Sequence, residues 1–426
     1  MVVAIFVGLL LVLFLMGFAV PYALVITSIV GMLYSGNFNL TAMGTVAQKM
    51  SAGVNSFTLL AIPFFLLAGK MMNVGSITNR IFKFCNALVG WIPGGLGQVN
   101  ILASVVFAGM SGSAVADAAG LGTIEIRAMS DEGFDKEFSA GITAASSTIG
   151  PIIPPSIPLI MFGTAAGASI SDLLVGGIVP GVVCALCLGL MVGIMSVKRK
   201  YPRRKLPTLR ELWTLFRKSF LSLLTPVILI GGILTGKFTA TEAAGVATLY
   251  ALILVCIVYH EVSLKDLVAV FKSTCGEAAA VMLVVAGSTL YGYMLTKFMI
   301  PKMVLEFFLS VSSSKYMFLL MINIFLLFVG CFMDANAAIL IMAPILTPAA
   351  VSFGINEVHF GLIMVFNLMI GLITPPVGNC LYATARVANI SFEKMVKGAS
   401  YFYLPLFVTL VIITMIPSVT LCLIGG

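Results

Sequence analysis

The chain has 426 residues, of which 60% are hydrophobic and only 9% are charged, and its mean hydropathy is +1.13. Soluble domains carry about 25% charged residues, so the composition excludes a soluble protein and predicts one that lies in lipid. The net charge of +8 could suggest a nucleic-acid partner, but nine of the 24 Lys and Arg residues fall in one window, 198–218. Directly after an apolar stretch, such a cluster is typical of a cytoplasmic loop, and we expect no nucleic-acid partner.

Apolar stretches long enough to cross a bilayer recur from the first residues onward. The first stretch covers residues 2–20 and continues through Leu33. It lacks the basic region and the small-residue cleavage site of a secretory signal, so we expect a retained first helix. Later stretches, such as 178–197 and 404–423, again reach 18 residues or more. The sequence therefore predicts an all-α polytopic membrane protein.

Two halves of the chain carry related motifs at a single offset of 221 residues. The segment Ile149-Gly-Pro-Ile-Ile-Pro-Pro155 recurs as Ile370-Gly-Leu-Ile-Thr-Pro-Pro376, and Gly109-Met-Ser-Gly-Ser113 aligns with Gly330-Cys-Phe-Met-Asp334. Because internal self-similarity indicates a repeat architecture, we divide the chain into a first repeat over 1–197, a basic linker over 198–218 and a second repeat over 219–426. Each repeat should contain a re-entrant helical hairpin, at 96–127 and 316–353, and a broken transmembrane helix, at 138–162 and 358–384.

The distribution of basic residues predicts that the two repeats are inverted. Five full crossings separate the predicted hairpins, so the hairpins enter from opposite faces. With the 198–218 loop in the cytoplasm, 19 Lys and Arg residues lie inside and five lie outside. This split obeys the positive-inside rule.

The breaks and the hairpin tips are the candidate site. In hydrocarbon every backbone polar group needs a partner, so a span interrupted by Gly150-Pro151 and Pro154-Pro155 must line a cavity or bind something. Half-helix ends at such breaks offer partial charges to ions at the membrane midplane. The tips Ser111-Gly-Ser113 and Asp334-Ala-Asn336 supply the opposing wall.

Carbonyl, hydroxyl and carboxylate oxygens suit a hard cation, and the scarcity of thiolate and imidazole groups argues against a transition metal. We expect Na⁺ as the coupling ion and no organic cofactor. The expected sodium positions lie in the two tips and the two breaks: Ser111, Ser113, Gly150, Pro154, Gly330, Asp334, Gly371, Thr374 and Gly378.

Acidic residues at membrane depth are the most informative single positions. An intramembrane carboxylate costs at least about 2.5 kcal/mol, so it normally lines a polar pathway or binds a cation. Asp334 is the strongest candidate, with a local helix cap as the alternative. For Asp117, Glu125 and Glu242 a cap or scaffold role is at least as plausible. Elsewhere, residues 263–277 predict an amphipathic helix lying on the membrane, and Trp213 fits an interfacial anchor.

Four separated motifs resemble the large membrane subunit of tripartite ATP-independent periplasmic (TRAP) transporters. They are Gly109-Met-Ser-Gly-Ser-Ala-Val-Ala-Asp117, Gly150-Pro-Ile-Ile-Pro-Pro-Ser156, Phe238-Thr-Ala-Thr-Glu-Ala-Ala244 and Gly371-Leu-Ile-Thr-Pro-Pro-Val-Gly-Asn379. The resemblance covers essentially the whole chain. It implies the ion-transporter superfamily fold and an elevator mechanism, in which a mobile body carries sodium and substrate past a fixed scaffold.

The resemblance also implies partners and a place in the cell. A periplasmic binding protein would deliver an organic acid, and a small four-helix membrane subunit, expected here as a separate chain, would widen the scaffold in the bacterial inner membrane. Sialic acid or a C4-dicarboxylate is the expected substrate class, and the few fixed positive charges in the core favour sialic acid. The substrate contacts that follow are Ser111, Ser156 and Asp334, with Asn379 counted beside them at the second break.

Three other functions remain open at this point. A stand-alone sodium–dicarboxylate symporter of similar architecture would need no binding protein. A channel would want a continuous polar pore, whereas the polar groups gather at two breaks. An intramembrane enzyme would want a nucleophile with a base, and neither histidine is expected near Ser111, Ser156 or Asp334.

Overall fold

The computed structural model describes residues 4–34, 40–74, 77–311 and 314–424. Over these residues the chain is helical and contains no strand. Seven helices are long and apolar enough to cross a membrane, or up to eight if the bent pair formed by Met43–Val54 and Phe57–Asn73 is counted as one span. The all-α polytopic membrane fold is confirmed.

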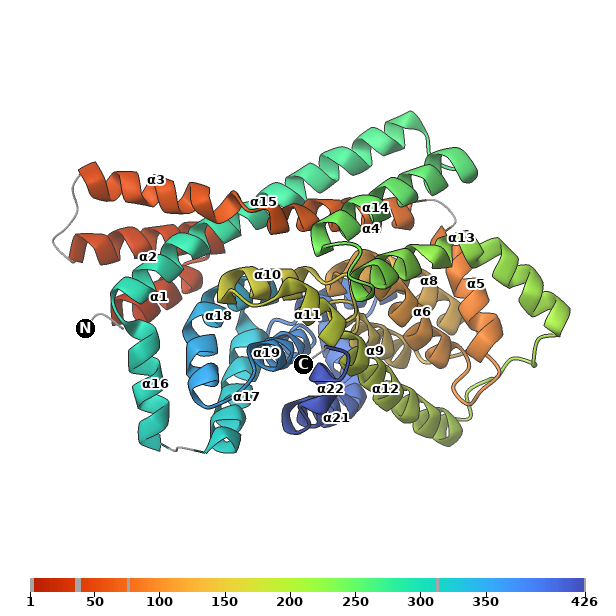
Figure 1. Cartoon of the computed structure of the whole chain (residues 1–426). Coiled ribbons are helices and arrows are strands. Elements are labelled where there is room, and N and C mark those ends of the chain that lie inside the picture. The colour runs from red at the N-terminus through yellow and green to blue at the C-terminus, as the bar shows by residue number, and fades with distance from the viewer. Residues whose placement is uncertain (1–3, 35–39, 75–76, 312–313, 425–426) are drawn as a thin grey trace.

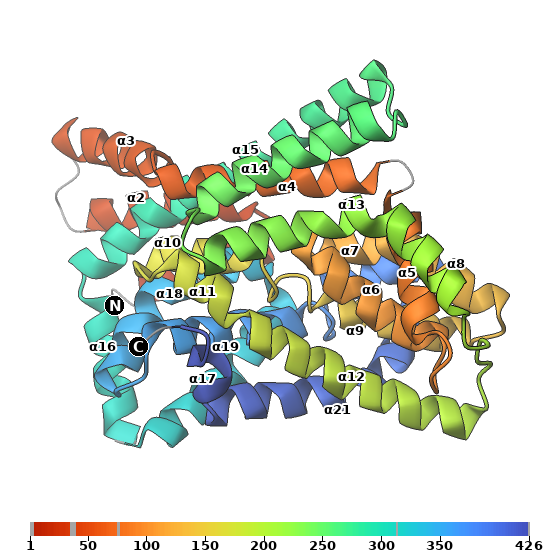
Figure 2. The same cartoon turned by 45° about the vertical axis from the view of Figure 1, so that its right-hand side comes forward.

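The helices form two layers, which are separated most clearly in Figure 1. The upper layer of that view contains α1 (Leu10–Leu15), α2 (Val20–Tyr34), α3 (Leu40–Val54), α4 (Ala61–Asn73), α14 (Ala240–Ile253) and α15 (Leu264–Lys297). The lower layer contains α5 (Ile77–Val89), α6 (Leu96–Ser111), α7 (Ala114–Ala119), α8 (Leu121–Asp131), α9 (Lys136–Ser147), α10 (Ile157–Ala166), α11 (Ile170–Gly176), α12 (Ile178–Arg199), α17 (Lys315–Phe332), α18 (Ala335–Ser352), α19 (Glu357–Gly371), α20 (Asn379–Ala388), α21 (Phe392–Met415) and α22 (Ser418–Leu421). Between the layers runs α13 (Leu209–Leu234), and α16 (Ile300–Val311) connects α15 to the lower layer, as Figure 2 also shows.

The first apolar stretch forms a helical hairpin rather than one helix, so the prediction of a single helix through Leu33 is wrong. The chain turns between α1 and α2, where Gly17 has a φ of +82°, a conformation that favours glycine. The ring of Phe6 then packs against Gly31, where an added Cβ would lie 2.4 Å from a ring carbon. Both halves are apolar, so hydropathy alone cannot reveal the turn between them. Residue 2, where the predicted stretch begins, lies outside the described residues.

The amphipathic segment 263–277 was expected to be a helix lying on the membrane. It is helical, but the helix does not end near Glu277. The segment is the first part of α15, a single helix of 34 residues that continues to Lys297. Lys70 of α4 forms an ion pair with Glu277 at 2.7 Å and also donates a hydrogen bond to Ser273. These contacts tie this part of α15 to the upper layer.

Helix pairs joined by a turn or by a non-helical break occupy the ranges predicted for the hairpins and the broken helices. The first hairpin runs from α6 through a turn at Gly112 into α7 and α8, and the second runs from α17 into α18. The broken helices are α9 with α10 and α19 with α20, and their non-helical breaks cover 148–156 and 372–378. Each break contains a cis Pro–Pro bond.

The second half of each broken helix packs against the hairpin from the other half of the chain. α10 contacts α18, and α20 contacts α7. Buried amides join each hairpin to its own broken helix as well. Asn100 of α6 donates to Thr143 of α9 at 2.7 Å, and Asn367 of α19 donates to the side chain of Asn323 of α17 at 2.7 Å. The two hairpins and the two broken helices therefore form one continuous body in the lower layer.

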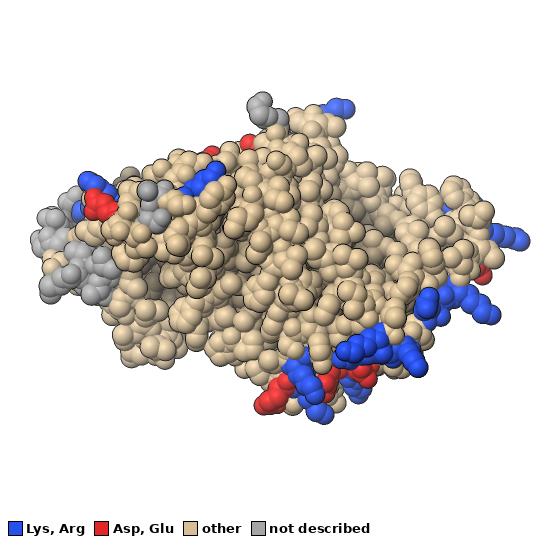
Figure 3. Space-filling view, turned by 90° about the horizontal axis from the view of Figure 1, so that it is seen from below, with Lys and Arg blue, Asp and Glu red and all other residues tan. Residues whose placement is uncertain are grey.

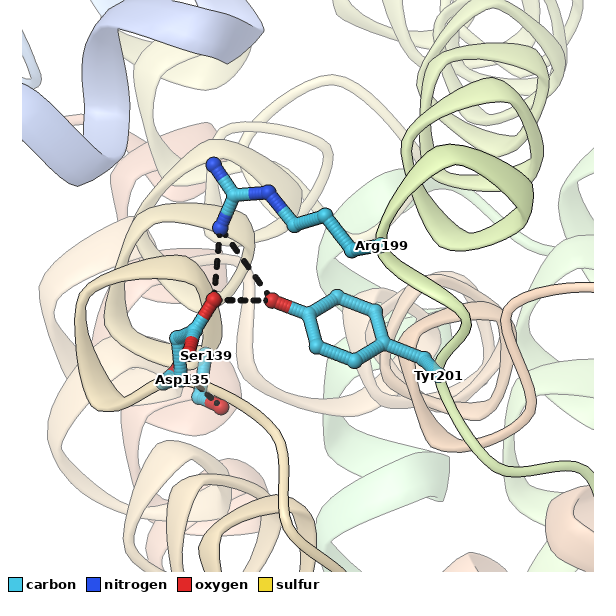
Figure 4. A network of polar contacts seen from close by, with 4 residues as sticks. All are labelled: Asp135, Ser139, Arg199 and Tyr201. Atoms are coloured by element: carbon cyan, nitrogen blue, oxygen red, sulfur yellow. Dashed lines mark hydrogen bonds and ion pairs between the residues drawn. The ribbon is translucent and has the colours of Figure 1, made fainter.

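The basic window is mostly helical. Its non-helical part covers 200–208, because α12 continues to Arg199 and α13 begins at Leu209. Figure 4 shows that the start of this loop is hydrogen-bonded to the N-terminus of α9. There Asp135 accepts hydrogen bonds from Arg199 at 2.8 Å and Tyr201 at 2.6 Å. Burial, and then the hydrogen bond to Asp135, raises the pKa of Tyr201 to about 12. The phenol is therefore protonated and donates at neutral pH.

Candidate functional site

A central cavity of about 270 Å³ lies where the two hairpin tips meet. The first tip contributes residues 112–115 and the second contributes residues 334–336. Pro151 of the first break, Leu372 of the second break, and three residues of α10 and α19 (Ile157, Pro158 and Met369) complete the lower-layer wall, and α4 and α15 of the upper layer close the other side. The cavity therefore lies between the two layers, which the sequence did not predict.

Asp334 lies in the cavity wall, as its carboxylate was expected to do. It is also the N-cap of α18, where Oδ1 accepts hydrogen bonds from the backbone N–H groups of Asn336 at 3.0 Å and Ala337 at 3.3 Å. The residue is exposed and lines the cavity. The carboxylate can therefore cap α18 and face the cavity at the same time, because a cap uses one oxygen and leaves the other able to accept a bond.

The first hairpin tip brings Ser111 and Asp117 together. The buried Ser111 hydroxyl donates a short hydrogen bond to Oδ1 of Asp117, while Oδ2 of the same carboxylate is buried without a hydrogen-bond partner. A Cβ added to Gly150 would lie 2.5 Å from that Oδ2, so the carboxylate faces the first break directly. Ser113 instead caps α7 and lines the central cavity.

Asp117 is therefore a residue that the sequence interpretation undervalued. Its Cα lies on a helix of six residues that follows the Ser-Gly-Ser turn, and its carboxylate is only 2% exposed. The general rule that an intramembrane acid marks a functional pathway could have ranked it with Asp334. Motif matching could not have shown that Asp117 faces Gly150, because the distance between these two residues depends on how the hairpin packs against the break.

Within the first break, two of the expected sodium positions offer open carbonyls. The carbonyls of Gly150 and Pro154 accept no hydrogen bond from any described residue. Ser156, expected to touch substrate, is fully buried and caps α10, accepting from the N–H of Leu159 at 3.2 Å and donating to the Pro151 carbonyl. Its hydroxyl does not line the central cavity.

The second break differs from the first in how its carbonyls are used. The Gly371 carbonyl accepts from the N–H of Thr374 at 3.0 Å, and the Gly378 carbonyl accepts from the N–H of Leu381 at 2.8 Å. Thr374 itself bonds back to the Ile370 carbonyl at 2.7 Å. Among the expected positions of this break, Thr374, Gly378 and Asn379 do not line the central cavity.

Gly330 and Gly371 contact each other where the second hairpin meets the second break. A Cβ on Gly371 would lie 2.5 Å from the backbone of Gly330, so the two helices touch through their main chains. Neither glycine lines the cavity. Their placement shows a packing role that does not depend on an ion.

The upper-layer wall of the cavity carries an acidic side chain that the sequence analysis did not single out. Glu277 of α15 lines the cavity and pairs with Lys70 of α4, which does not line it. The side chain of Glu277 is 55% exposed and that of Lys70 is 22% exposed. The cavity wall therefore presents a carboxylate whose charge is balanced by a lysine behind it.

Two other acids can be placed. Glu242 accepts from the N–H of Thr239 at 2.8 Å in a capping box at the start of α14, so its cap interpretation is confirmed. Glu125 is buried in α8 and one of its oxygens has no partner. Within the described residues, no group of three or more His, Cys, Asp or Glu could hold a metal ion.

The comparisons with known proteins agree over nearly the full length. Residues 7–419 match the family described as the tripartite ATP-independent periplasmic transporter, DctM component. The chain belongs to this family. Its relatives are named as transporter permeases, so the protein is a large TRAP permease subunit and not an enzyme.

Three curated relatives illustrate the substrates for which similar permeases are named. The sialic acid TRAP transporter large permease protein SiaM of Vibrio cholerae is 44% identical, with 90% of each chain covered. The sialic acid TRAP transporter permease protein SiaT of Haemophilus influenzae is 43% identical over 96% of this chain and 66% of the relative. The C4-dicarboxylate TRAP transporter large permease protein DctM of Pseudomonas aeruginosa is 38% identical over 91% of this chain and 90% of the relative.

Among solved structures, the YdaH transporter of Alcanivorax borkumensis has a TM-score of 0.64. The match covers 88% of each chain at 12% identity. At this identity the likeness concerns the fold alone.

Proposed function

We propose that this TRAP permease subunit carries an organic acid of the sialic acid or C4-dicarboxylate class into the cell, driven by a sodium gradient, by an elevator mechanism. One observation carries the proposal. Both hairpin tips and both broken helices converge on a single cavity whose opposite wall belongs to the other layer. A ligand held there touches both layers, so movement of one layer past the other would expose it alternately to the two sides of the membrane.

The order of helices supports inverted repeats. The sequence α2, α3–α4, α5, α6, α7–α8, α9–α10, α12 is followed by α14, α15, α16, α17, α18, α19–α20, α21, in which each element falls close to the 221-residue offset of the motifs. The main difference is that the α3–α4 pair is bent by 54° whereas α15 is one helix. We assign the upper layer to the scaffold and the hairpins and broken helices to the mobile body.

For sodium we propose a first site at Asp117, Ser111 and the open carbonyl of Gly150. A hard cation prefers oxygen ligands, and the unpartnered Oδ2 of Asp117 faces the break that holds Gly150. The proposal revises the expected ligand set by adding Asp117. Ser113, Pro154, Thr374 and Gly378 stay as candidates from the sequence, whereas we assign Gly330 and Gly371 to packing.

For the substrate we propose contacts at the central cavity with Ser113 and the second tip, including Asp334. The names of SiaM and DctM supply the two candidate substrate classes. Both classes are carboxylates, and Lys70, the ion-pair partner of Glu277 in the cavity wall, is a cation that would attract such a group. Coupling then requires that sodium and substrate bind with positive cooperativity, since Asp334 alone would repel an acid.

The partners and the orientation follow from the family and the charge pattern. We propose that a periplasmic binding protein delivers the acid and that a separate small membrane subunit contacts the scaffold. The chain would lie in the bacterial inner membrane with residues 198–218 on the cytoplasmic side.

Uptake into proteoliposomes tests the proposal. Liposomes containing the chain and its small subunit receive an inward sodium gradient, with and without the cognate binding protein. We expect uptake that needs both. Uptake with sodium alone would instead identify a stand-alone symporter, and uptake without a sodium gradient would refute sodium coupling.

Asp334→Ala tests the substrate site, with Asn356→Ala as its matched control. Asn356 caps α19 by accepting from Val358 and His359, the same pattern of bonds that Asp334 makes, but it does not line the cavity. Either change removes a cap worth about 1 kcal/mol. We expect Asp334→Ala to abolish uptake while the protein still assembles, and Asn356→Ala to keep uptake. Normal uptake in the Asp334 variant would refute its role.

A further inference from the structure

A second groove lies away from the central cavity, between α5 and the start of α13. It has a volume of about 710 Å³. Its lining includes four basic side chains from three segments: Lys83 of α5, Arg204 and Lys205 of the 200–208 loop, and Arg210 of α13. We call this feature the basic groove. Figure 3 shows Lys and Arg side chains gathered toward one end of the lower face, in contrast to the uncharged centre.

The charges in the basic groove are only partly balanced. Arg204 pairs with Glu132, and its Nε lies 2.8 Å from a carboxylate oxygen. Lys83, Lys205 and Arg210 make no ion pair with the described residues. The one acid in the lining is Glu211, whose carboxylate already accepts from the N–H of Thr208 at 2.9 Å. The groove therefore has spare positive charge that a ligand with an anionic group would neutralise.

Apolar side chains continue from the basic groove onto the outside of the protein. Leu206, in the lining, is 67% exposed, and Trp213, one turn beyond Arg210, is 62% exposed. From there α13 continues as a candidate membrane span to Leu234. Trp is enriched at the boundary between lipid headgroups and acyl chains. A ligand that fits this arrangement has an anionic head for the groove and an apolar tail for the outer face of α13.

We propose that the basic groove binds the phosphate headgroup of an anionic phospholipid, with an acyl chain along Leu206 and Trp213. A free phosphate would match the basic side chains but would leave the adjacent apolar surface unused. Basic pockets beside membrane helices on the cytoplasmic side are suited to such headgroups. Because Arg204 lies in the groove and also pairs with Glu132 at the end of α8, a lipid there joins α5, α13 and the hairpin through one loop.

Trp213 provides a direct readout. The chain contains two Trp residues, so Trp91→Phe leaves Trp213 as the only indole. The full chain with this change is titrated in detergent micelles with brominated phosphatidylglycerol or brominated phosphatidylcholine, and quenching of Trp213 is followed. We expect phosphatidylglycerol to bind more tightly, by about fivefold for each unpaired basic side chain at low salt, and the preference to shrink as salt rises.

Two triple variants separate a site from a general charge effect. Lys83→Gln, Lys205→Gln and Arg210→Gln together should remove the preference for phosphatidylglycerol. The control Lys265→Gln, Lys272→Gln and Lys394→Gln removes the same number of exposed basic side chains elsewhere and should keep it. Phosphatidylglycerol should also raise the thermal unfolding temperature of the control triple variant but not that of the groove triple variant. Equal quenching by both lipids, or an equal loss of preference in both triple variants, would overturn the proposal.

Two further arms distinguish other occupants. Inorganic phosphate that stabilises the chain as strongly as phosphatidylglycerol would mean that the groove holds a free anion, and the lipid proposal would fail. If the co-purified small membrane subunit abolishes quenching in the chain and the triple variant of the groove weakens subunit binding, the groove is covered by protein rather than lipid. We expect neither result.

Discussion

A close backbone contact at the candidate site gives a sharp prediction for Gly371→Ala. The new Cβ would lie 2.5 Å from Cα and from C of Gly330 and 2.6 Å from its carbonyl oxygen, whereas ordinary contacts of a Cβ begin at 3.4 Å. The atoms it meets are main-chain atoms of α17, so they cannot rotate away as the end of a side chain can. The second hairpin and the second broken helix must therefore separate by nearly 1 Å.

The size of the effect follows from two opposing terms. Overpacking of a tight contact costs about 1–3 kcal/mol, and replacing Gly by Ala in a helix recovers up to about 1 kcal/mol of helix propensity. We expect the free energy of unfolding to fall by about 1–2 kcal/mol. We also expect a marked loss of uptake, because the contact positions the tip that carries Asp334. If Gly371 served only to bind sodium through its backbone carbonyl, Gly371→Ala would be harmless, because alanine keeps that carbonyl. The predicted loss therefore separates a packing role from a ligand role.

A graded series makes the test specific. The Cβ of Gly330→Ala would lie 3.2 Å from the nearest atom of Gly371, and that of Gly245→Ala in α14 would meet nothing within 4 Å. Thermal unfolding and sodium-driven uptake should therefore be most impaired in the Gly371 variant, less in the Gly330 variant and unchanged or slightly improved in the Gly245 variant. If Gly371→Ala unfolds and transports like the unchanged protein, the inferred packing is wrong.

Three further predictions use the same purified protein. Glu277→Gln should lower the KM for an acidic substrate by up to about tenfold, because it removes a negative charge from the cavity wall and frees Lys70. Asn367→Ala should lower stability by about 1–3 kcal/mol, measured by thermal unfolding, because it leaves the partly buried Oδ1 of Asn323 without its donor. Tyr201→Phe should cost about 0.5–1.5 kcal/mol through loss of the bond to Asp135. Because the pKa of Tyr201 is raised from 10.0 to about 12, this contribution should be full below pH 10 and lost as the pH rises toward 12.

The first two of these predictions have matched controls, and the third has a refuting outcome. Glu393→Gln changes an exposed acid outside the cavity, and an equal fall in KM there would indicate a general charge effect. Thr296→Ala removes an exposed hydroxyl bonded within its own helix and should cost less than about 0.5 kcal/mol. A Tyr201→Phe variant whose stability matches that of the unchanged protein across the pH range would show that the bond to Asp135 is not stabilising.

The sequence by itself determined the features that depend on local chemistry. Long apolar stretches require a membrane, and proline removes backbone donors and interrupts a helix wherever it falls inside one. The breaks at 148–156 and 372–378 and the hairpin turns near Gly112 and Asp334 could therefore be located to within a few residues. The motifs at these positions also identified the family.

Only the tertiary structure decided which of these groups face one another. Ser111 and Ser156 have the same chemistry in the sequence, yet one hydroxyl meets a buried carboxylate and the other is used within its own break. The pairing of Asp117 with Gly150 and of Lys70 with Glu277 joins positions far apart in the chain. Local patterns carry no information on such distances, because they are set by how whole helices pack. For the same reason, hydropathy revealed neither that the chain turns at Gly17 nor that residues 264–297 form the single unbroken helix α15.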